Sequence, residues 1–94
     1  MSRLTELEPV FVDYLPETIE EGKLYISKKY RNALHLCACG CKSEVYTPLS
    51  KMELPSMWEL TESDGKVSLS PSIGNFQIPC KTHYFIRDNQ VIWL

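Results

Sequence analysis

Two short segments of the sequence concentrate residue types that bind metal ions. The segment Leu36–Lys42 alternates cysteines with small residues, and the segment Pro79–Tyr84 carries a cysteine and a histidine separated by two residues. Thiolates and imidazoles are the ligands of structural zinc sites, where four of them surround the ion at about 2.0–2.3 Å. The sequence therefore predicts one bound metal ion, zinc in the first instance, with these candidate ligands: Cys37, Cys39, Cys41, Cys80 and His83.

The candidate ligands outnumber the four positions of a tetrahedral site. Cys80 and His83 have the two-residue spacer common in zinc loops and form the best-supported pair. Spacing alone does not decide which of Cys37, Cys39 and Cys41 stays outside the site. Because the two segments are far apart in the chain, a metal shared between them would close a long loop and stabilise a small domain.

Two other chemistries compete with a structural zinc site. His35 precedes Cys37 by two positions, so two histidines and two cysteines could hold a Rieske-type iron–sulfur cluster, although Rieske loops place the cysteine before the histidine. A cysteine- or zinc-dependent enzyme would need His83 or His35 as a base beside a thiol, or an open metal position. No such pair stands out, and no familiar catalytic or phosphate-binding motif is present, so catalysis is the less expected role.

Length and composition point to a single globular domain covering residues 1–94. The chain is 44% hydrophobic and 23% charged, and its net charge of −2 argues against nucleic-acid binding. The sequence contains no apolar stretch long enough for a membrane span and no secretory signal, so a cytoplasmic location is expected. In a reducing compartment, clustered cysteines bind metal more often than they form disulfides.

Frequent prolines and glycines divide the chain into segments too short for long helices. Alternating apolar and β-branched residues predict strands at 9–14, 23–27, 33–37, 44–47, 58–61, 67–70, 84–87 and 90–94. Asp64-Gly65 and Asp88-Asn89 are hairpin turn signals, whereas 16–21 and 49–53 could each form one helical turn. We expect an all-β domain, a small antiparallel barrel or sandwich, with zinc-knuckle-like cysteine loops at one end.

The segment Pro71–Phe76 is expected to form an irregular loop just before the second metal-binding segment. Its Ser72 and Asn75 side chains could hydrogen-bond to backbone groups or to the thiolates, and a loop that recognises a partner is the alternative. The ordered strings HLCACGC, SLSPSIGN and PCKTHY give the chain its most specific features.

These strings resemble those of an uncharacterised bacterial family, the domain-of-unknown-function family 6527. The resemblance extends from about Val10 to Trp93. It implies metal binding, and an accessory role in a bacterial ubiquitin-like conjugation system or in phage defence. Together with the residue chemistry, it leads to the hypothesis of a small zinc-stabilised module that binds a protein partner.

Overall fold

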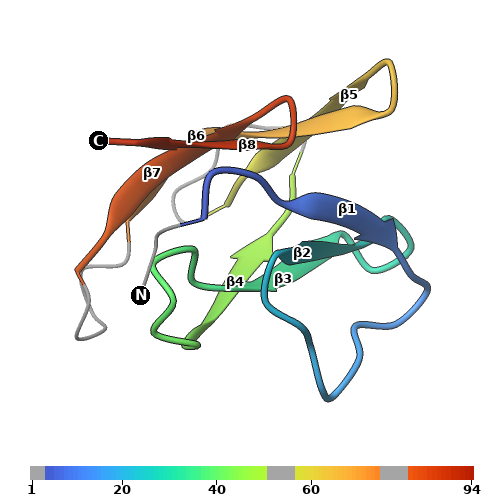
Figure 1. Cartoon of the computed structure of the whole chain (residues 1–94). Helices are drawn as coiled ribbons and strands as arrows, with labels where there is room; N and C mark the ends of the chain where they lie inside the picture. Colours follow the sequence, from blue (N-terminus) through green and yellow to red (C-terminus); the bar gives the residue numbers. More distant parts are fainter. Residues whose placement is uncertain (1–3, 51–56, 75–80) are drawn as a thin grey trace.

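The structure is a computed structural model that describes residues 4–50, 57–74 and 81–94. The described residues form eight β-strands. The first sheet contains β1 (Glu8–Phe11), β2 (Lys23–Ser27), β3 (Asn32–Leu36) and β4 (Glu44–Pro48), in that spatial order. The second contains β5 (Glu59–Ser63), β6 (Lys66–Gly74), β7 (His83–Arg87) and β8 (Gln90–Trp93), also in chain order. Figure 1 shows the two sheets lying one above the other. The prediction of an all-β domain built from short strands is confirmed.

Two local predictions are wrong. The strand β1 runs parallel to β2, with Glu8 opposite Lys23, whereas an antiparallel sheet was expected throughout. The connection across residues 12–22 explains the difference, because it is long enough to return the chain to the starting end of the sheet. Residues 16–21 lie in this connection and form no helix, since one isolated turn does not offset the cost of helix nucleation. The segment 49–53 lies largely outside the described residues.

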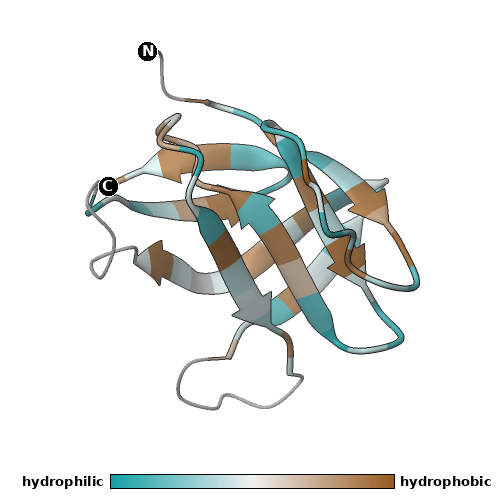
Figure 2. Cartoon of the chain, turned by 90° about the horizontal axis from the view of Figure 1, so that it is seen from below, coloured by the Kyte–Doolittle hydropathy of each residue, from teal (hydrophilic) through white to brown (hydrophobic). Residues whose placement is uncertain are grey.

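Alternation along the strands creates the core between the sheets. In β3 and β4 every second residue is buried, and in β7 Tyr84 and Ile86 are buried while their neighbours face outward. The hydropathy colours in Figure 2 change from residue to residue along the strands. The shared core includes Leu24, Ile26, Ala33 and Val45 from the first sheet and Val67, Leu69, Ile73, Tyr84 and Ile86 from the second. Among the described residues, no helix has the length and apolarity needed to cross a membrane.

Both predicted hairpin turns are present. Asp64 and Gly65 have φ angles of 52° and 77°, and Asp88 and Asn89 have φ angles of 49° and 66°. Positive φ at both central residues gives a turn whose twist matches that of the flanking strands. Asn89 does more than turn the chain, because its side-chain oxygen accepts a hydrogen bond from the Val67 backbone N–H at 2.8 Å.

Replacing Asn89 with alanine is expected to destabilise the domain by about 1–3 kcal/mol. The change removes the side-chain acceptor of Val67 and places a residue that disfavours positive φ at this turn. Urea denaturation measures the free energy of unfolding. Asn89→Gly is the matched control, because glycine relieves the backbone strain while losing the same hydrogen bond. Equal stability of the two variants would show that backbone strain contributes nothing at this position.

Strand β6 includes residues 71–74 of the segment that was expected to be an irregular loop, and the last two residues of that segment lie outside the described residues. Its pairing with β7 joins Leu69 to Ile86 and then Ile73 to Tyr84, so the register shifts between these pairs. Three residues of β6 thus stand where β7 has only Phe85. Such bulges bend a strand and re-aim its side chains, and this one lies immediately before the end of β6.

Candidate functional site

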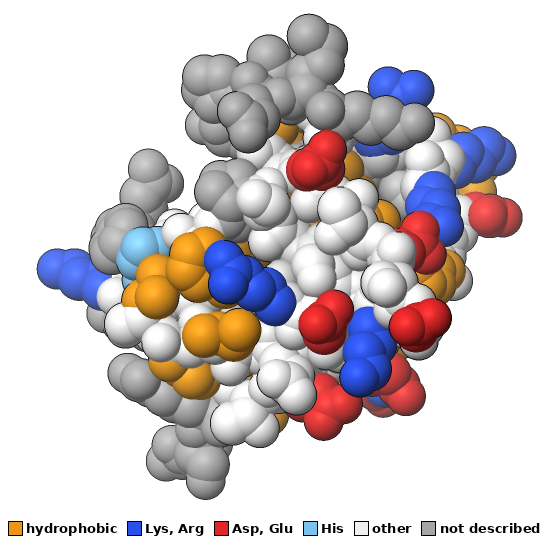
Figure 3. Space-filling model, turned by 90° about the horizontal axis from the view of Figure 1, so that it is seen from above, with side chains coloured by type: hydrophobic (Ala, Val, Ile, Leu, Met, Phe, Trp, Pro, Cys, Tyr) orange, Lys and Arg blue, Asp and Glu red, His pale blue; other side chains and the backbone are white. Residues whose placement is uncertain are grey.

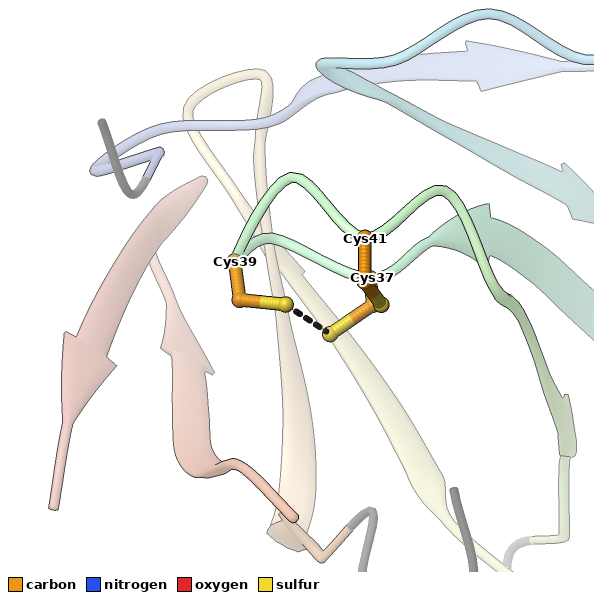
Figure 4. Close-up of side chains that lie close together, drawn as sticks. All are labelled: Cys37, Cys39 and Cys41. Carbon is orange, nitrogen blue, oxygen red and sulfur yellow. Dashed lines mark hydrogen bonds between the residues drawn. The ribbon is translucent and has the colours of Figure 1, made fainter. Parts of the chain in front are cut away.

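The turn between β3 and β4 brings three sulfur atoms together. Cys37, Cys39 and Cys41 each offer one Sγ atom, and all three lie within 4.8 Å of one another. Figure 4 shows the side chains converging from this one loop. The backbone closes the turn through hydrogen bonds from Cys37 N–H to the Ser43 carbonyl and from Gly40 N–H to the Cys37 carbonyl. Gly40 has a φ of 94°, a conformation that costs glycine little.

The spacing of these sulfur atoms fits a tetrahedral metal centre. In such a centre with zinc–sulfur bonds of about 2.3 Å, neighbouring sulfurs lie roughly 3.8 Å apart. Cys37 Sγ and Cys39 Sγ are 3.5 Å apart, and Cys41 Sγ lies within 4.8 Å of both. Burial decreases from Cys37, which is fully buried, to Cys41, which is exposed. The three cysteines can therefore hold a metal ion at the edge of the core.

The cysteine turn is in direct contact with the strand that carries His83. Cys37 Sγ lies 3.2 Å from Thr82 Oγ1, and Thr82 is the residue immediately before β7. Thr82 is itself buried. A thiolate or a metal-bound sulfur at Cys37 would accept a hydrogen bond from this hydroxyl. The cluster thereby fixes the chain just before His83.

His83 contacts a serine on the neighbouring strand. Its Nε2 atom lies 2.7 Å from Ser72 Oγ, and both side chains are partly buried. Gly74 is the register partner of His83, so Ser72 lies diagonally across from it on the same outward face of the second sheet. The Ser72 carbonyl accepts a hydrogen bond from Trp58 Nε1 at 3.4 Å, which holds this part of β6 in place.

A serine hydroxyl hydrogen-bonded to an imidazole can act as a nucleophile. An imidazole nitrogen at 2.6–3.2 Å is close enough to take the hydroxyl proton as the oxygen attacks a carbonyl carbon. At 2.7 Å, His83 is in this range. Because Ser72 and His83 are only partly buried on an outward face, a substrate could reach them from solvent. A serine–histidine contact of this length is one element of the active sites of acyl-transfer enzymes.

His35 lies in a different environment. It is fully buried, and its Nε2 atom is 2.7 Å from the Tyr84 hydroxyl. Burial lowers the pKa of His35 to about 4, so the ring is neutral at physiological pH. Its Nδ1 atom has no hydrogen-bond partner among the described residues. His35 is therefore a polar member of the core, and the group of close sulfur ligands does not include it.

Replacing Tyr84 with phenylalanine is expected to lower the free energy of unfolding by about 1–3 kcal/mol. The ring and its packing on Trp93 remain, but the buried His35 Nε2 loses its hydroxyl partner. Denaturant unfolding measures the loss. Tyr46→Phe is the matched control, because Tyr46 is 55% exposed and its hydroxyl bonds to Asn32 on the surface. An equal effect of both substitutions would contradict a special cost for the buried pair.

The described residues include four of the five predicted metal ligands. Cys37, Cys39 and Cys41 come together as expected, and their joint metal binding is supported without identifying the metal. Cys80 lies outside the described residues. The predicted role of His83 as a metal ligand stays a prediction, and its Nε2 atom lies 2.7 Å from Ser72 Oγ. Among the described residues, the close sulfur group includes neither His35 nor His83, and the Rieske hypothesis stays a prediction.

Sequence reasoning singled out Ser72 but gave it the wrong partner. The serine was expected to bond backbone groups or thiolates from a loop, whereas it bonds His83 from a strand. The contact could have been found only from strand pairing. If 71–74 is assigned as strand and paired with His83–Arg87, Ser72 and His83 lie on the same face of the sheet. No local motif marks such a pair, since it forms across two strands.

Comparison with protein families identifies a match over most of the chain. The family model described as "Bacterial ubiquitination-like system serine protease (BubE)" matches residues 11–94. No curated protein and no solved structure matches the chain. The resemblance to a bacterial family is thereby confirmed, although the matching model is that of BubE and not of domain-of-unknown-function family 6527. With nearly the whole chain matched, the protein belongs to the BubE family of bacterial ubiquitination-like system serine proteases.

Proposed function

We propose that this protein is a serine peptidase in which Ser72 is the nucleophile and His83 is the general base. The observation that carries the proposal is the 2.7 Å contact between Ser72 Oγ and His83 Nε2 on an outward face of the second sheet. The family description supports the same reaction class. The substrate we propose is a protein of a bacterial ubiquitination-like system, cleaved at a peptide or isopeptide bond.

The reaction would follow the acyl-transfer sequence. Ser72 Oγ adds to the carbonyl carbon of the scissile amide while its proton passes to His83 Nε2. The carbon–nitrogen bond then breaks, the acyl group stays on Ser72 as an ester, and His83 returns the proton to the leaving amine. Water next attacks the ester as His83 takes its proton. The carboxylate product leaves, and the proton returns to Ser72 Oγ.

The cysteine group serves this chemistry indirectly in our proposal. Zinc would be held by Cys37, Cys39 and Cys41, with Cys80 as the fourth ligand, in a closed site that stabilises the fold. Support comes from the mutual spacing of the three sulfurs. The contact between Cys37 and Thr82 connects this site to the start of β7. The metal site would thus position His83 without touching the substrate.

The remaining expectations fit this proposal. A thiol-rich metal site needs reduced cysteines, which favours the cytoplasm. The protein partner that was expected from the sequence becomes the substrate, or a complex that presents it. An accessory role in a conjugation system then means removal or maturation of the conjugated protein.

Labelling with a fluorophosphonate probe tests the proposed function. The probe forms a covalent bond to a serine only when the oxygen is activated, so peptide mass spectrometry of the wild-type protein should find it on Ser72. Labelling should disappear in Ser72→Ala and fall strongly in His83→Gln. Ser70→Ala is the matched control, because Ser70 is an exposed serine on the same strand. A wild-type protein that stays unlabelled, or is labelled elsewhere, would overturn the proposal.

A further inference from the structure

Next to the Ser72–His83 pair, the outward face of the second sheet carries apolar side chains. Figure 3 shows hydrophobic side chains gathered beside a histidine on this face, with a positively charged side chain against them. Phe85 follows His83 by two positions on β7, and Ile92 is its register partner on β8. Leu94 adjoins His83, since its backbone N–H donates to the His83 carbonyl at 3.0 Å. We call Phe85, Ile92 and Leu94 the apolar patch.

The patch is exposed where a solitary domain would be expected to carry polar residues. Ile92 is 40% exposed and Leu94 is 63% exposed, while Phe85 is half-buried. The guanidinium of Arg87 lies over the Phe85 ring at 4.4 Å from its centroid and bounds the patch. Alternation accounts for why these side chains point outward, because Tyr84, Ile86 and Val91 on the same strands fill the core. Strand alternation does not explain why these outward-facing side chains are apolar. A group of exposed apolar side chains is typical of a binding surface.

The order of the strands places the patch relative to the reacting atoms. Ser72 lies on β6, His83 on the neighbouring β7, and Ile92 and Leu94 on or just after β8, the next strand. His83 therefore stands between the nucleophile and most of the patch. In serine peptidases the histidine gives its proton to the leaving amine, so the leaving part of the substrate passes on the histidine side. The residues that follow the scissile bond should then extend over β7 and β8.

We propose that the apolar patch binds apolar side chains of the substrate on the C-terminal side of the scissile bond. This inference rests on the proposed function, and it adds a substrate preference to it. The occupant is an extended segment of the substrate chain whose first few residues after the cut include Leu, Ile, Val, Met or Phe. Burial of one such side chain against Phe85 and Ile92 selects it over a charged residue at the same position.

Digestion of a pool of short random peptides tests the inference. Mass spectrometry of the products gives the residues on both sides of every cut. For wild-type protein we expect apolar residues in the first positions after the cut to be favoured over aspartate by about tenfold. Ile92→Asp should abolish this preference, because a carboxylate would then face the apolar side chain. Tyr46→Asp is the control, since Tyr46 is also an exposed hydrophobic residue but lies on the other sheet, and this variant should retain the preference.

The outcomes separate the two proposals. Fluorophosphonate labelling of wild-type Ser72, measured on the same preparation, reports the serine–histidine pair without involving residues after the cut. If Ser72 is labelled but the preference is missing, or lies before the cut, or survives Ile92→Asp, then the patch is not this subsite and only the further inference fails. If Ser72 is not labelled, the proposed function itself fails.

Discussion

Replacing Ser72 with alanine is expected to lower the rate of peptide hydrolysis by at least about 10³-fold. The hydroxyl oxygen would be the atom that forms the acyl bond, and it lies 2.7 Å from His83 Nε2, the proposed proton acceptor. The measurement is the appearance of new amino termini from a peptide pool at saturating and at low substrate. Both kcat and kcat/KM should fall together, because the lost interaction exists only in the reaction.

The histidine should behave as part of the same unit. His83→Gln keeps a polar side chain near Ser72 but removes the proton acceptor, so the loss should be of similar size. The double variant should be no worse than either single variant, because nucleophile and base act in one step. Ser70→Ala provides the baseline, since that serine is exposed on the same strand and should retain full activity.

A different outcome would point to a different site. Near wild-type rates in Ser72→Ala, with loss in a cysteine variant that keeps its fold, would favour the thiol- or metal-dependent reaction considered from the sequence. Additive losses in the double variant would mean that Ser72 and His83 contribute separately and not as a nucleophile–base pair. A melting curve of each variant shows whether the protein is still folded, so that a loss of activity can be distinguished from unfolding.

Most strands and both hairpin turns could be predicted, because each depends on residues that are close together in the sequence. The strand predicted at Lys23–Ser27 has the bounds of β2, and Asp-Gly and Asp-Asn adopt the positive φ angles that two hairpin turns need. The parallel pairing of β1 could not be predicted in this way. It depends on where the connection 12–22 returns the chain, and no residue pattern in that segment specifies the direction.

For the candidate site too, the part formed within one turn could be predicted, and the part formed by long-range strand pairing could not. The sulfur group was predictable because its three members come from one turn, so spacing along the chain is close to spacing in the molecule. Ser72 and His83 come from two strands whose register shifts at a bulge, and one extra residue there would move the serine to the other face. Long-range register of this kind is a property of the packed sheet. The serine was therefore noticed, but its partner was not.

Removing the metal is expected to produce the largest loss of stability in this protein. We predict one zinc ion per chain by native mass spectrometry of protein purified under reducing conditions. A strong chelator should then lower the melting temperature by at least about 10 °C, because a domain of this size shifts by roughly 4–8 °C for each kcal/mol and structural zinc contributes several. Added zinc should restore the melting temperature. Cys39→Ser should lower both the zinc content and the melting temperature.

Ser43→Ala is the control for the cysteine variant. Ser43 lies in the same turn, but its contribution to the turn is its backbone carbonyl, which accepts the Cys37 N–H and which alanine retains. This variant should bind zinc and melt like the wild type. Protein that contains no metal, and whose melting curve is unchanged by the chelator, would remove the zinc site from the proposal while leaving the Ser72–His83 pair in place.

Metal loss should also reduce catalysis before the domain unfolds. Cys37 Sγ lies 3.2 Å from Oγ1 of the buried Thr82, and the next residue is His83. If the cysteine turn becomes more mobile, this contact weakens and the position of the His83 base becomes less fixed. Peptide hydrolysis measured well below the melting temperature of the chelated protein should therefore already be lower than in the zinc-bound form. Thr82→Val separates the two effects, because it keeps the metal ligands and the side-chain volume but removes the hydroxyl. If this variant binds zinc and still hydrolyses peptides at the wild-type rate, the cysteine group stabilises the fold without positioning His83.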